Sequence, residues 1–172
     1  MHLVLLMFPL LAMLAVAAVI DFRSRRIPNW LTIVIAVTGL LQAASWSHSV
    51  AGGWMSIVGL AVGLAINLPL FALGLRGGGD VKLFAGVGAW LGPVNVVAVF
   101  IVATVVAMLV AILQAIVTRR VSQVARNTAS MAVGLIHPES RVDSTDQASY
   151  AARHVPYAVP ILVAVIALVG LR

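Results

Sequence analysis

Long runs of hydrophobic residues, free of internal charges, alternate with short polar stretches along this chain. A helix needs ~20 apolar residues to cross the ~30 Å hydrocarbon core of a bilayer, and most of these runs approach that length. The pattern predicts an all-α polytopic membrane protein that forms a single domain over residues 1–172. We expect six transmembrane helices, at about residues 3–20, 30–46, 53–75, 81–92, 94–118 and 155–171.

The first hydrophobic run has a second interpretation, as a signal peptide. Ala15-Val16-Ala17 resembles a small-residue cleavage site. The start of the run carries no Lys or Arg, however, and five further apolar runs follow it. These features favour a membrane helix that stays in place.

The fourth helix is expected to be short. The fourth and fifth runs form one apolar stretch that should break at Gly92-Pro93, because proline interrupts a helix. From Val81 to Leu91 a helix spans only ~17 Å. Asp80 should therefore lie within the cytoplasmic half of the membrane. The preceding Gly77-Gly78-Gly79 is expected to be non-helical backbone, which is tolerated at that depth only when it is buried in protein or lines water.

Composition narrows the class of protein further. The 172 residues are 62% hydrophobic and 9% charged, and they include no cysteine. Soluble domains carry about 25% charged residues, so this chain requires lipid as its solvent. The absence of cysteine excludes disulfides, a thiol nucleophile and cysteine-based metal sites. The four histidines lack metal-ligand spacing, and we expect no metal and no cofactor.

The basic residues predict the orientation in the membrane. The net charge of +6 does not indicate nucleic acid binding, because the basic residues sit in short connections beside the apolar runs. With six crossings, ten of the eleven basic residues fall on one side, which the positive-inside rule assigns to the cytoplasm. Both termini would then be outside, and a polar loop at about 119–154 would be cytoplasmic. The ten residues are Arg23, Arg25, Arg26, Arg76, Lys82, Arg119, Arg120, Arg126, Arg141 and Arg153.

Two aspartates border the hydrophobic runs, on the same predicted side. Asp21 follows the first run and Asp80 precedes the fourth, while the other three acidic residues lie together in the 119–154 loop. Acids at the edge of the hydrocarbon are costly and generally mark a functional site. Two neighbouring carboxyl groups do not both ionise easily, so one keeps its proton. Such a pair can hydrolyse a peptide bond by general acid–base catalysis.

Structural roles for these aspartates are the alternative. Asp80 could be a helix N-cap that binds free backbone N–H groups, and Asp21 could pair with Arg23 or Arg25 at the surface. A third interpretation is a small membrane transporter or assembly subunit whose aspartates bind a proton or an ion.

The third run contains two further features. Gly59 and Gly63 form a small-xxx-small pattern, which predicts a close helix contact within the bundle or between copies of the chain. Asn67 either lines the site or forms a satisfied hydrogen bond at a kink.

At the aspartates the chain resembles a known family. The run Gly77-Gly78-Gly79-Asp80-Val81-Lys82-Leu83 matches G-x-G-D-x-K-L, the second aspartate motif of the type IV prepilin peptidases. Asp21-Phe22-Arg23-Ser24-Arg25-Arg26-Ile27-Pro28-Asn29 is similar to the first. Presenilin-like proteases share G-x-G-D alone, and the Lys82-Leu83 continuation points to the prepilin branch. The resemblance covers about residues 10–118.

The resemblance implies an intramembrane aspartic endopeptidase in which Asp21 and Asp80 form the catalytic dyad. It implies a cytoplasmic membrane of a prokaryote, with the site facing the cytoplasm, and a prepilin or pseudopilin precursor as substrate. The expected supporting residues are Gly77, Gly78, Gly79 and Lys82.

The size of the chain refines this expectation. Larger members add a cytoplasmic domain with a four-cysteine zinc site and methylate the new N-terminus, for which this chain has neither cysteines nor room. We expect peptidase activity without methyltransferase activity, as in the small peptidases of Flp-type (tight-adherence) pilus systems. Archaeal preflagellin peptidases are similar in size. The oligomeric state stays open.

Overall fold

The computed structural model describes residues 2–24, 26–47, 50–73, 76–117 and 157–170, and within these ranges the chain is all-helical. The expected loop at about 119–154 lies outside them. Five helices are present: α1 (His2–Ser24), α2 (Asn29–Ser47), α3 (Val50–Ala72), α4 (Gly78–Val117) and α7 (Ala158–Gly170).

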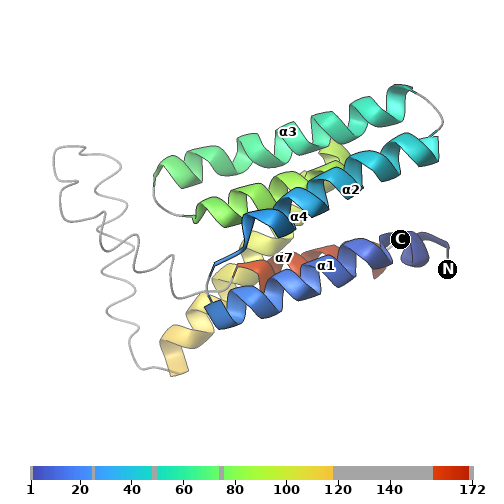
Figure 1. Cartoon of the computed structure of the whole chain (residues 1–172). Helices are drawn as coiled ribbons and strands as arrows, with labels where there is room; N and C mark the ends of the chain where they lie inside the picture. Colours follow the sequence, from blue (N-terminus) through green and yellow to red (C-terminus); the bar gives the residue numbers. More distant parts are fainter. Residues whose placement is uncertain (1, 25, 48–49, 74–75, 118–156, 171–172) are drawn as a thin grey trace.

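Helix α4 is interrupted where the sequence predicted a break. Gly92 has φ 77° and ψ 175°, which is non-helical, and Pro93 follows it. A positive φ of this kind is accessible to glycine at little cost, whereas a side chain would be strained. Figure 1 shows the chain turning back at this point, so the two parts of α4 lie in different places in the bundle.

The helix ends meet on one side of the bundle. The first part of α4 packs beside α2 and α3, while α7 packs against α1 and α4. Figure 1 shows the end of α1, the start of α4 and the start of α7 at the left-hand end of the bundle. The start of α1 and the end of α7 lie at the opposite end. The two predicted aspartates are therefore on the same end of the molecule.

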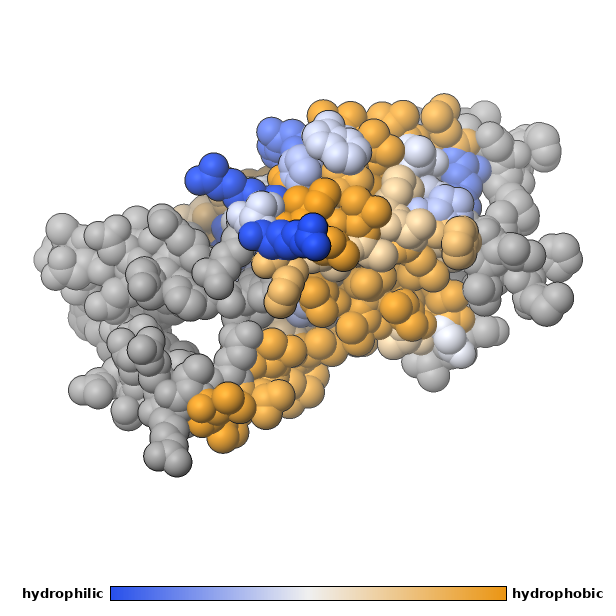
Figure 2. Space-filling view, turned by 60° about the horizontal axis from the view of Figure 1, so that its bottom comes forward, coloured by the Kyte–Doolittle hydropathy of each residue, from blue (hydrophilic) through white to orange (hydrophobic). Residues whose placement is uncertain are grey.

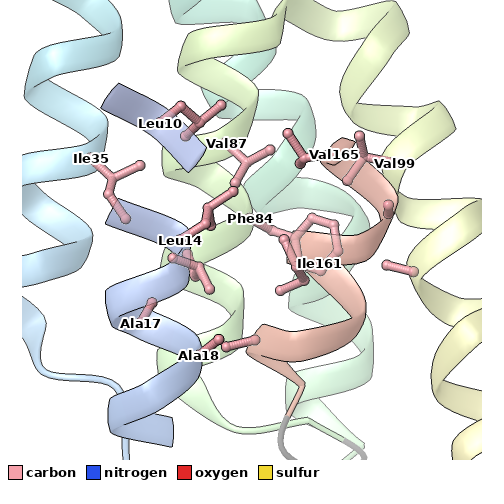
Figure 3. Close-up of a cluster of buried hydrophobic side chains, with 14 of the residues drawn as sticks. Leu10, Leu14, Ala17, Ala18, Ile35, Phe84, Val87, Val99, Ile161 and Val165 are labelled. Carbon is pink, nitrogen blue, oxygen red and sulfur yellow. The ribbon is translucent and has the colours of Figure 1, made fainter. Parts of the chain in front are cut away.

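The core is formed where α1, α4 and α7 converge. Figure 3 shows side chains from these helices pointing toward one another, with Phe84 in the middle and Ile35 of α2 at the edge. Phe84, Leu14, Ile161 and Val99 are fully buried. Burying a side chain of this size stabilises the fold by about 1.5–3 kcal/mol relative to water, although a lipid-facing reference reduces that gain.

The outer surface is apolar, as expected of a membrane protein. Figure 2 shows a face on which hydrophobic residues cover most of the described surface. Every helix exposes large hydrophobic side chains, including Phe8, Ile33, Trp54, Ile101 and Ile166. The buried residues, by contrast, include Asp21, Asp80, Arg76 and Asn67. A bilayer solvates such an exterior and water does not.

The number of crossings is only partly established. Three helices are long and apolar enough to cross a membrane, over Met7–Ser24, Gly52–Ala72 and Gly78–Leu113. The described apolar parts of α2 and α7, Asn29–Ala43 and Ala158–Gly170, are shorter. The count of six crossings and the placement of the termini outside stay predictions.

One expectation about the glycines is wrong. All three of Gly77, Gly78 and Gly79 were expected outside a helix, but α4 begins at Gly78. Only Gly77 precedes the helix, and its carbonyl accepts the first helical hydrogen bonds from the N–H groups of Asp80 and Val81, at 3.1 and 3.4 Å. The helix begins before the predicted residue 81 because the Gly77 carbonyl satisfies the N–H groups of Asp80 and Val81.

Candidate active site

Asp21 lies in the last turn of α1 and is buried against the start of α7. Its Oδ2 accepts a hydrogen bond of 3.1 Å from the backbone N–H of Ala158, the first residue of α7. The first N–H groups of a helix have no partner within the helix, and the positive end of the helix dipole favours a carboxylate there. Asp21 thus binds α7 rather than forming a surface ion pair with Arg23.

Asp80 lies in the first turn of α4, with only 9% of its surface exposed. Its carboxylate turns back toward Gly77, whose backbone N–H donates to it. A carboxylate three residues inside a helix that binds the N–H of the capping residue resembles half of a capping box. The expectation that Asp80 is a helix cap is therefore correct in part: its carboxylate binds a backbone N–H at the helix start, but from the third residue of α4. The other carboxylate oxygen stays available for a chemical role.

The fold brings the two aspartates into one neighbourhood. They come from α1 and α4, which are separated in the chain by α2 and α3. Asp80 nevertheless lies close enough to Asp21 for the two carboxylates to interact electrostatically. Both are buried, so this interaction is weakly screened by water.

The glycines before Asp80 permit a close approach of two chain segments. A Cβ on Gly79 would lie 3.2 Å from the Cβ of Ile27, in the connection between α1 and α2. A Cβ on Gly78 would lie 3.4 Å from the ring of Phe71. A larger residue at position 79 would push the start of α4, and Asp80 with it, away from α1.

Lys82 connects two helix starts rather than the two aspartates. Its Nζ donates a hydrogen bond of 2.9 Å to Oδ1 of Asn29, the first residue of α2. The α2 start is also fixed by the carbonyl of Pro28, which accepts from the N–H of Leu31 at 3.1 Å. Lys82 lies just after the first turn of α4 and thus holds the start of α2 beside the turn that carries Asp80.

A buried arginine accompanies the aspartates. Arg76 is 6% exposed, and its guanidinium donates to Oδ1 of Asn67 on α3 and, at 3.4 Å, to the hydroxyl of Thr104 on α4. Asn67 completes its own bonding by donating to the Gly63 carbonyl at 2.9 Å. Asn67 is therefore a satisfied buried polar group, and its role in lining the site stays a prediction.

Three aromatic rings surround the same guanidinium. The Cζ of Arg76 lies 5.1 Å from the ring centroids of Phe84 and Phe100, and 5.0 Å from that of Tyr157. A cation within about 6 Å of a ring face is attracted to it, by ~2 kcal/mol or more when both are desolvated. Arg76 therefore joins α3, both parts of α4 and the start of α7.

The protonation states of Arg76 and Tyr157 follow from their surroundings. Burial lowers the pKa of the Arg76 guanidinium, while Tyr157 and Asp80 act to raise it. An arginine starts so far above neutral pH that it stays charged in proteins. Burial raises the pKa of the Tyr157 hydroxyl, which therefore keeps its proton and can donate it in a hydrogen bond.

Sequence reasoning did not identify Arg76 and Tyr157 as part of the site. Arg76 was used only as a marker of orientation, although a charged residue four positions before Asp80, at the edge of an apolar run, is a recognisable signal. Tyr157 carries no such signal, because only the packing of α7 brings it to the aspartates.

Comparisons with known proteins identify the family of the chain. The sequence profile of the type IV leader peptidase family matches residues 8–112, which include both aspartates. A preflagellin peptidase of Methanococcus voltae is 36% identical over 80 residues, a match that covers 44% of this chain. The chain spans 34% of the length of that relative. No solved structure matches the chain.

Proposed function

Since the chain belongs to the type IV leader peptidase family, we propose that it cleaves the leader peptide of a prepilin, pseudopilin or preflagellin precursor, with Asp21 and Asp80 as an aspartic dyad. The observation that carries the proposal is the presence of two buried carboxylates at one end of the bundle, within electrostatic range of each other. The peptidase class rests on the family match.

The proposed mechanism uses a water molecule between the two side chains. One carboxylate takes a proton from the water as it attacks the scissile carbonyl carbon. The other, protonated, carboxyl group donates its proton to the carbonyl oxygen, and a proton then passes to the leaving amine nitrogen. No covalent intermediate with the protein forms. Gly77, Gly78, Gly79 and Lys82 support this chemistry by fixing the first turn of α4.

We further propose that the site faces the cytoplasm of a prokaryotic cell. The basic residues near the dyad end, including Arg23, Arg26 and Lys82, support this orientation through the positive-inside rule. A leader peptide rich in basic residues would meet the dyad on that side of the membrane. The activity is proposed to be proteolytic only, without N-methylation.

The test is cleavage of a prepilin-type and a preflagellin-type precursor by purified protein in detergent. We expect the wild type to cut at least one of them without any ion gradient, which a transporter would require. Asp21→Asn and Asp80→Asn keep the side-chain shape but cannot exchange the proton, so both should be inactive. Removing a principal catalytic group typically costs at least 10²-fold in rate.

Ser56→Ala is the matched control, because Ser56 is also buried and its hydroxyl donates to the Ala89 carbonyl away from the dyad. It should cut at the wild-type rate. Near-wild-type activity of either folded aspartate variant would show that the two residues do not act as a dyad.

A further inference from the structure

Arg76 is a buried charge that the proposed mechanism does not use. Among the described residues its hydrogen-bonding and cation–π partners are neutral: the Asn67 amide, the Thr104 hydroxyl and the aromatic rings around its Cζ. Asp80 acts on the guanidinium electrostatically, without forming an ion pair with it. A charge buried in a protein is costly unless its surroundings compensate it, and neutral groups compensate it less fully than a carboxylate. Arg76 is held at this cost four residues before Asp80, just outside α4, and packing alone does not explain it.

The contact between Arg76 and Tyr157 is the one that reaches α7. Phe84, Phe100 and Thr104 all belong to α4, and Asn67 belongs to α3. Tyr157 directly precedes α7, and its carbonyl accepts the first helical hydrogen bond from the N–H of Ile161, at 3.3 Å. Arg76 therefore holds the N-terminal cap of α7.

Ala158, which follows Tyr157 and is the first residue of α7, contacts Asp21. The Ala158 N–H donates to Asp21 Oδ2 at 3.1 Å. Tyr157 itself lies within electrostatic range of Asp80. A continuous set of contacts thus runs from the Arg76 guanidinium through the Tyr157 ring and the Ala158 N–H to the Asp21 carboxylate. The start of α7 therefore links Arg76 to Asp21.

We propose that Arg76 is a positioning residue for the aspartate pair, and that it acts by docking the start of α7 through the Tyr157 ring. The inference rests on the proposed function, because it assigns Asp21 a place in the dyad. Moving the start of α7 would release the Ala158 N–H from Asp21 and change the separation of the two carboxyl groups. A displacement of about 1 Å at a reacting group can lower a rate about 10²-fold.

The experiment compares Arg76→Gln, Tyr157→Leu and Tyr157→Phe with wild type in detergent, with Ser56→Ala as the control. Glutamine cannot bind Asn67 and Thr104 together, and it has no charge to place against the ring. We expect Arg76→Gln and Tyr157→Leu to lower kcat about 10- to 100-fold with little change in KM. Tyr157→Phe keeps the ring and should retain most of the wild-type kcat.

Hydrogen exchange provides the readout that a general loss of stability would not reproduce. Peptides covering the start of α7 should exchange faster in Arg76→Gln and Tyr157→Leu than in wild type. Exchange at the buried first part of α4 should change little. Ser56→Ala should change neither kcat nor exchange at α7.

Three results would overturn the proposal. They are a wild-type kcat in Arg76→Gln, a change confined to KM, or a lowered kcat with unchanged exchange at the start of α7. If Arg76→Gln does not fold, Tyr157→Leu tests the same contact from the other side, and a wild-type kcat there is equally decisive. Active Asp→Asn variants would instead refute the dyad itself.

Discussion

Buried polar groups at the site have hydrogen-bond partners in distant parts of the chain: Arg76 binds Asn67 of α3, and Asp21 binds the Ala158 N–H of α7. Asn67 is the clearest case, since it donates to Gly63 on its own helix and accepts from Arg76. In a low-dielectric interior each such bond counts for more than in water, and a partner left unmatched is correspondingly costly. Single polar substitutions should therefore affect stability more than their size suggests.

Asn67→Ala tests this at the residue scale. The change removes an acceptor from a buried, charged guanidinium, which should cost about 1–3 kcal/mol of folding stability or more. We expect a lower melting temperature in detergent and a reduced kcat, because Arg76 would lose one of its anchors. Thr32→Ala, which removes a hydroxyl bonded only to its own helix at Asn29, is the comparison. Equal melting temperatures for Asn67→Ala and wild type would contradict the assigned role.

At the scale of elements, the crossing of α3 and α4 depends on small residues. A Cβ on Gly59 would collide with the Gly88 carbonyl, and one on Gly88 would collide with the Gly59 carbonyl. A Cβ on Gly63 would lie too close to the Phe84 carbonyl. The small-xxx-small pattern therefore marks a contact within the bundle, and the absence of side chains lets the two backbones touch.

Gly88→Ala should separate these helices. Overpacking a close contact costs about 1–3 kcal/mol, and here the obstacle is backbone that cannot rotate away. Gly53→Ala in the same α3 is the matched control, because nothing lies within 4 Å of the added Cβ. It should be neutral or stabilising by up to about 1 kcal/mol. The melting temperatures of the two variants in detergent measure these effects. Equal melting temperatures for Gly88→Ala and Gly53→Ala would contradict the close contact between α3 and α4.

At the scale of the whole molecule, Asp21 and Asp80 lie at one end of a bundle with an apolar exterior. The end of α1 and the start of α4, which carry Asp21 and Asp80, lie there, and the end of α2 and the start of α3 lie at the other end. The proposed peptidase would therefore cut close to one membrane surface. The orientation of the bundle therefore decides which compartment the substrate's cleavage site must occupy.

The cysteine-free sequence allows a direct test of orientation. Ser24→Cys places a thiol at the end of α1, and Ser47→Cys places one at the end of α2. In sealed vesicles of known orientation, an impermeant maleimide should label position 24 only from the cytoplasmic side and position 47 only from the opposite side. Labelling of both from the same side would refute the topology, and reversed labelling would refute the cytoplasmic site.

Much of the fold could be predicted because its determinants are local. Apolar runs specify membrane helices, and the predicted 30–46 helix is observed at Asn29–Ser47. The interruption at Gly92 followed from the proline beside it. The start of α4 was placed less well, because whether Gly78 and Gly79 join a helix depends on bonds to the Gly77 carbonyl rather than on glycine itself.

The sequence by itself determined the class of protein, the positions of most helices and the two acidic residues that stand out against an apolar background. The tertiary structure decided what surrounds those acids. Tyr157 and Ala158 lie far from Asp21 and Asp80 in the chain, and only the packing of α7 against α1 and α4 brings them together. Hydrophobicity and helix breaks are properties of short segments, whereas the partners of a buried charge are set by contacts between distant ones.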